Sequence, residues 1–150
     1  MKNKIFNAQP LNTDIGLLLF RLILGGLMVY HGYTKLISYD EILPQFGDPI
    51  GIGQQLSFNL VIFAEFFCSI FVALGLLTRL AVIPIIIDMT VAVIVAHAND
   101  PFEVKEKAFM FLALSVAVFV SGSGRFSIDS LIFRNRRKNL ATDKKIGWSV

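Results

Sequence analysis

Residues 56–77 read LSFNLVIFAEFFCSIFVALGLL, an apolar run in which Glu65 is the only charged residue. A helix rises about 1.5 Å per residue, so roughly 20 apolar residues cross a hydrocarbon core about 30 Å thick. The run lacks the two-residue alternation of a barrel strand, and an open sheet is not possible in lipid. The stretch therefore predicts a transmembrane helix over Leu56–Leu77.

Three other runs have the same character: Ile15–Ile37, Leu80–Ala98 and Ala108–Val120, the last of which is short unless it extends back through 102–107. Hydrophobic residues make up 55% of the chain and charged residues only 17%, against about 25% charged in a typical soluble domain. We therefore predict an all-α protein, a four-helix transmembrane bundle. Its membrane domain covers 14–129, between a cytoplasmic N-terminal segment, 1–13, and a basic cytoplasmic tail, 130–150.

The distribution of lysine and arginine predicts the orientation. One side of the bundle, formed by the termini and the 78–79 turn, holds ten of them: Lys2, Lys4, Arg79, Arg125, Arg134, Arg136, Arg137, Lys138, Lys144 and Lys145. The other side holds Lys35, Lys105 and Lys107. Because cytoplasmic loops carry the excess of basic residues, both termini are predicted on the cytoplasmic side of the plasma (inner) membrane.

Several functional classes are excluded or disfavoured. The basic run at 134–138 directly follows the last apolar span, where it suits anionic lipid head groups, so the predicted partner is the bilayer and not a nucleic acid. Cys68 is the only cysteine, which excludes an intrachain disulfide and a CxxC redox pair. His31 and His97 lack a haem spacing signature, no phosphate-binding or hydrolase motif is present, and no metal site is predicted.

Ionisable residues inside the spans are the candidate functional residues, because such groups are costly in lipid and usually face the bundle. Glu65 lies roughly 12 Å and His31 roughly 9 Å below the outer helix ends. Lys35 shares a face with His31 by i,i+4 spacing, and His97 closes the outer end of its span. We expect these four to line one ligand-binding or proton-handling pocket with Glu65 at its floor, and a base on the first helix, His31 or Lys35, to lie within hydrogen-bond or one-water reach of the Glu65 carboxylate. The alternative is a buried structural pair that fixes the helix register.

Other polar residues are assigned structural roles: Arg21, Arg79, Arg125 and Asp88. Arg21 is expected to extend to the inner head groups, with Asp14 as a candidate partner. Asp88 is nine residues from His97, or about 900° of helix, so the two face opposite ways unless the helix bends or ends before His97. Whether Asp88 pairs with Arg21 or Arg79, or carries a proton, stays open.

Two further expectations concern packing. Gly25 and Gly32 are seven residues apart and share a face, which allows another helix backbone to approach closely. The segment Gly122–Asp129 is expected to fold back against the cytoplasmic base, where Arg125 would meet a carbonyl or carboxylate partner.

Five short motifs occur in order along the chain: HGYTKL at 31–36, Glu65, GLLTR at 75–79, Ala92 with His97, and GSGRFSID at 122–129. Together they resemble the DoxX family of bacterial and archaeal membrane proteins. The resemblance implies a four-helix transmembrane bundle, with recurring polar positions at His31, Lys35, Glu65, Arg79, His97 and Arg125. Family relatives include a small subunit of a terminal quinol oxidase and a thiosulfate:quinone oxidoreductase component.

The function expected from this resemblance is that of an accessory subunit in redox metabolism, bound to a quinone-like or other small amphipathic ligand. No cofactor is required by the sequence, and quinone is the candidate; a membrane-associated oxidoreductase subunit is the candidate partner. Whether the chain is itself an enzyme stays open. The alternatives are a non-catalytic assembly or scaffold subunit and a small proton-coupled transporter, which would need a polar path through the inner half of the bundle.

Overall fold

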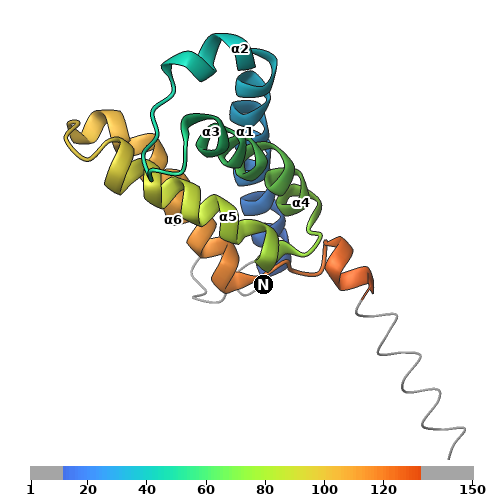
Figure 1. Ribbon diagram of the computed structural model, residues 1–150. Helices are drawn as coiled ribbons and strands as arrows, with labels where there is room; N and C mark the ends of the chain where they lie inside the picture. The colour runs from blue at the N-terminus through green and yellow to red at the C-terminus, as the bar shows by residue number, and fades with distance from the viewer. Residues whose placement is uncertain (1–11, 133–150) are drawn as a thin grey trace, which may run out of the picture.

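The computed structural model describes residues 12–132, and every regular element among them is helical (Figure 1). In chain order the elements are α1 (Thr13–Ile37), α2 (Tyr39–Ile42), the 3-10 turn η2 (Leu43–Gln45), α3 (Gln54–Ile62), the π-helical η3 (Phe63–Cys68), α4 (Ser69–Leu74), α5 (Thr78–Val91), the π-helical η4 (Ala92–Ala96) and α6 (Phe102–Ser121). The predicted N-terminal segment and basic tail lie almost wholly outside the described residues.

Within residues 12–132, three helical stretches are long and apolar enough to cross a membrane: Thr13–Ile37, Gln54–Leu74 and Thr78–Ala96. They correspond to the first three predicted spans, with ends that differ by at most three residues. Most of their large apolar side chains are exposed on the protein surface, which suits a lipid environment. The all-helical class is thus confirmed.

The predicted four-helix transmembrane bundle is confirmed only in part. α6 is a fourth long helix packed against α5, but its first two turns carry Glu103, Lys105, Glu106 and Lys107. Three helices therefore meet the length and composition of a span.

Glycines on α1 allow the close helix contact that their spacing predicted. A Cβ built on Gly32 would lie 2.5 Å from the Phe66 nitrogen, and one on Gly25 would lie 2.7 Å from the Ala73 Cβ. Any side chain at these positions would collide with η3 or α4, so α1 packs there backbone against backbone. The residues between the helices form an apolar core around Leu24, Val72 and Ile85.

The segment after α6 folds back over the α4–α5 turn, as predicted. The Asp129 carboxylate accepts hydrogen bonds from the backbone nitrogens of Leu77 at 2.7 Å and Thr78 at 3.0 Å, which caps the first turn of α5. Arg125 meets Asp14: its backbone nitrogen donates to that carboxylate at 3.0 Å, and its Nε lies 3.9 Å away. Arg79 donates to the Val120 carbonyl at 3.4 Å.

Arg21 corrects one expectation. Its side chain does not extend to head groups: the residue is 1% exposed and donates to the Phe126 carbonyl, beside Gly75. Asp14, its expected partner, contacts Arg125 instead. The structural role assigned to Arg21 is therefore played inside the protein, where its guanidinium joins α1 to the folded-back segment.

Candidate functional site

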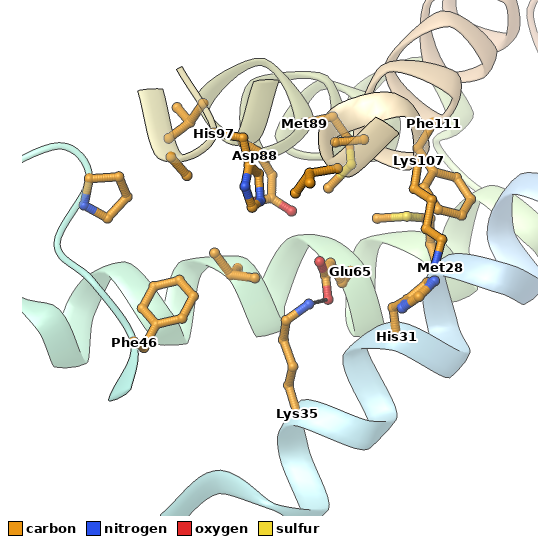
Figure 2. A pocket seen from close by; sticks show the side chains of 17 residues that line it. Met28, His31, Lys35, Phe46, Glu65, Asp88, Met89, His97, Lys107 and Phe111 are labelled. Atoms are coloured by element: carbon orange, nitrogen blue, oxygen red, sulfur yellow. Dashed lines mark hydrogen bonds and ion pairs between the residues drawn. The ribbon is translucent and has the colours of Figure 1, made fainter. Parts of the chain in front are cut away.

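A cavity of about 330 Å³ opens between the helices at the end of the molecule remote from the folded-back segment. Figure 2 shows that its wall includes all four residues predicted from the sequence: His31, Lys35, Glu65 and His97. They come from α1, η3 and the end of η4. The remaining wall is largely apolar, so the charged groups form a small polar patch in a hydrophobic pocket.

Glu65 and Lys35 form an ion pair across the α1–η3 contact. The Glu65 side chain is 6% exposed and that of Lys35 is 24% exposed. Gly32 makes the pair possible, because its contact with the backbone of Glu65 and Phe66 brings the two helices together one turn before Lys35. The prediction that a base on the first helix lies within hydrogen-bond reach of Glu65 is confirmed, with Lys35 as that base.

The wide turn of η3 surrounds Glu65. π-helical turns are rare, and they occur frequently at functional sites. The hydrogen-bond register shifts within Phe63–Cys68, directly around the acidic residue that lines the cavity. η4, which precedes His97, is the second such turn, so both π-helical segments adjoin the same pocket.

His31 contributes an aromatic edge to the wall. Its ring lies edge-on to Phe111, with centroids 5.6 Å apart, and to Tyr30, with centroids 6.0 Å apart. Of the two bases that the sequence offered to Glu65, Lys35 forms the pair, and His31 packs between helices α1 and α6.

Asp88 enters the same cavity, which answers the question of its direction. The π-helical turn η4 changes the helix register of the third span. The helix then ends before His97, whose φ of −109° and ψ of 26° lie outside the helical range. Asp88 and His97 therefore both line the pocket. Asp88 pairs with neither Arg21 nor Arg79, and its Oδ2 atom is buried without a hydrogen-bond partner among the residues described.

His97 lies toward the mouth of the cavity. Its Nδ1 is 2.7 Å from Asp100 Oδ2, and the two side chains are 39% and 45% exposed. The carboxylate orients the imidazole ring and holds one ring nitrogen, so His97 is a partly solvated rim residue.

Sequence reasoning missed several wall residues: Met28, Met89, Phe46, Lys107 and Phe111. Lys107 and Phe111 are four residues apart on α6, so their shared face was visible in the sequence. Phe46 was not predictable, because its place depends on the path of the 46–53 loop.

A hydrogen-bonded turn fixes that loop over the pocket. The Asp48 carboxylate accepts from the Gly53 nitrogen at 2.8 Å, the Ser57 hydroxyl at 2.8 Å and the Ile52 nitrogen at 3.1 Å. These hydrogen bonds hold the pKa of Asp48 below its usual range, and the bond from the Gly53 nitrogen has the largest effect. Phe46 packs on Phe58 with ring centroids 4.8 Å apart, which places it over the cavity.

Comparison with known proteins identifies a protein family that this chain matches. The family model described as DoxX matches residues 16–98. A Mycobacterium tuberculosis protein described as an uncharacterized membrane protein is 34% identical over 125 residues, which cover 73% of this chain and 76% of the relative. No solved structure matches the chain significantly. The matched range includes the polar wall residues of α1, η3 and α5, and it ends before α6.

Proposed function

The chain belongs to the DoxX family of membrane proteins, and we propose that it binds a small amphipathic, quinone-like molecule in the pocket around Glu65. The observation that carries this proposal is the Lys35–Glu65 ion pair in the wall of a cavity of about 330 Å³. Small-molecule sites are typically cavities of about 300–1,000 Å³ with apolar walls and a few convergent polar groups. The pocket has that composition.

Different parts of the pocket wall suit the apolar ring and the polar head group of such a ligand. Met28, Met89 and Phe111 offer flat or adaptable apolar contacts to a ring or tail (Figure 2). The charged pair offers both an acceptor, the Glu65 carboxylate, and donors on the Lys35 ammonium group. A ligand with a polar oxygen on an apolar ring satisfies both parts of the wall.

We propose further that the protein is an accessory subunit beside a membrane-associated oxidoreductase. In this role it supplies quinone to the oxidoreductase or retains quinone beside it. The resemblance to the DoxX family, whose relatives include a small subunit of a terminal quinol oxidase, supports this role. A transporter is less well supported, because the apolar core around Leu24, Val72 and Ile85 fills the space between the pocket and the base. A scaffold role is the main competitor, since an ion pair between α1 and η3 also fixes helix packing.

The direct test is the quinone content of the full chain purified in mild detergent. We expect organic extracts of the wild type to contain quinone at about one molecule per chain, and extracts of Glu65→Gln to contain at least about tenfold less, since the charged partner of the head group is lost. Glu41→Gln is the matched control, because Glu41 is exposed on α2 away from the cavity. Equal, trace amounts of quinone in all three proteins would contradict the proposal.

We also propose that α6 is the fourth span and that both termini are cytoplasmic. A phosphatase fused after Val150 should then be inactive, and one inserted at Gly47 should be active, because the enzyme works only outside the cytoplasm. The measurement separates four spans from three: with three spans the two positions lie on the same side. Activity at Val150 would overturn the topology.

A further inference from the structure

Asp88 is a polar wall residue outside the Lys35–Glu65 ion pair. It projects from α5 into the cavity, on the side facing Glu65 (Figure 2). Its Oδ2 atom is buried and has no hydrogen-bond partner among the residues described. Buried polar atoms in proteins nearly always have such a partner, so an unpartnered oxygen in a cavity wall points to a group supplied from outside the protein.

The charged and titratable groups around Asp88 do not supply that partner. From α1, Lys35 is engaged by Glu65. From the end of η4, His97 Nδ1 is engaged by Asp100. His31 packs edge-on against Phe111, and Figure 2 shows the Lys107 side chain on the His31 side of the cavity. One wall of the pocket therefore holds the Lys35–Glu65 pair, whose groups bond to each other. The facing wall holds the Asp88 oxygen, which has no hydrogen-bond partner among the residues described.

We infer that Asp88 is a second anchoring residue of the site, and that the ligand is a hydroquinone whose two hydroxyl groups meet Asp88 on one wall and the Lys35–Glu65 pair on the other. This inference rests on the function proposed above. A 1,4-hydroquinone carries hydroxyl groups on opposite edges of one ring, which matches polar groups on facing walls. Each hydroxyl both donates and accepts, so it satisfies the Asp88 carboxyl group whether or not that group carries a proton.

The test compares two probes on the full chain in lipid nanodiscs: a hydroquinone with a decyl tail, and the phenol with the same tail that lacks the second hydroxyl. By titration calorimetry, we expect the wild type to bind the hydroquinone at least about tenfold more tightly than the phenol. In Asp88→Leu the two affinities should become equal, through loss of hydroquinone affinity. Thr90→Val is the matched control, because the Thr90 hydroxyl bonds to the Ile86 carbonyl on the same helix.

A stability measurement excludes a merely structural role. Asp88→Leu removes a buried oxygen that has no hydrogen-bond partner within residues 12–132, so its melting temperature should equal or exceed that of the wild type. A lower melting temperature with both affinities reduced together would overturn the inference. So would an unchanged preference for the hydroquinone in Asp88→Leu, while loss of binding in Glu65→Gln would still support the proposed function. If neither probe binds the wild type, the proposed function itself fails.

Discussion

Replacing Glu65 by alanine should lower the free energy of unfolding by about 3 kcal/mol, because it leaves the Lys35 ammonium group without its counter-ion at the α1–η3 contact. Partial exposure of Lys35 puts the effect at the lower end of the range for broken buried pairs. Glu65→Gln retains the shape and a hydrogen-bond acceptor, so it should cost less. Both variants should lose the ligand. Equilibrium unfolding in mixed micelles measures the first effect, and extraction of bound quinone measures the second.

A double variant separates the structural from the functional role of this pair. Lys35→Met with Glu65→Leu removes both charges and fills the space with apolar groups, which commonly restores the stability lost by breaking a buried pair. We expect near wild-type unfolding with no bound ligand. If the double variant instead keeps the ligand, the pair only holds α1 against η3, and the binding site lies elsewhere.

Replacing Gly32 by alanine should lower the free energy of unfolding by a similar amount, about 3 kcal/mol. The added Cβ would lie 2.5 Å from the Phe66 nitrogen and 2.8 Å from the Glu65 carbonyl carbon, and a backbone cannot move aside as a side-chain end can. The separation of α1 from η3 would also draw Lys35 away from Glu65. Ligand retention should therefore fall together with stability.

Gly26→Ala is the matched control for this effect. Gly26 lies on the same helix, but a Cβ there would meet nothing within 4 Å. Alanine should stabilise the helix by about 0.5–1 kcal/mol relative to glycine. Equal unfolding free energies for the two variants would show that the close contact at Gly32 is absent in the membrane.

Much of this arrangement was predictable because lipid imposes simple rules. The spans follow from apolar length, and the polar positions within them from the cost of placing charge in hydrocarbon. The spacing of Gly25 and Gly32 predicted a close helix contact, since residues seven apart on a helix share a face. Glu65 and Lys35 were likewise predictable as a pair, because both lie at a similar depth on adjacent spans.

Other features depended on helix register and chain path. The sequence placed Asp88 and His97 on opposite faces of an ideal helix, and only the π-helical turn η4 and the end of the helix before His97 bring both into one pocket. Such turns have no reliable signal in a single sequence, because they arise from packing between helices.

The sequence by itself determined that this protein is helical, apolar and built for a membrane, and it identified Glu65 as a polar centre. Only the tertiary structure decided which groups meet. Arg21 is buried against Phe126 instead of reaching the surface, Phe46 covers the cavity, and Asp88 faces it without a hydrogen-bond partner among the described residues. The physical reason is that hydrophobic periodicity and the free energy of transfer into lipid are properties of each helix taken separately. Pairing, by contrast, depends on how closely the helices approach, and the backbone contact at Gly32 sets that distance only after folding.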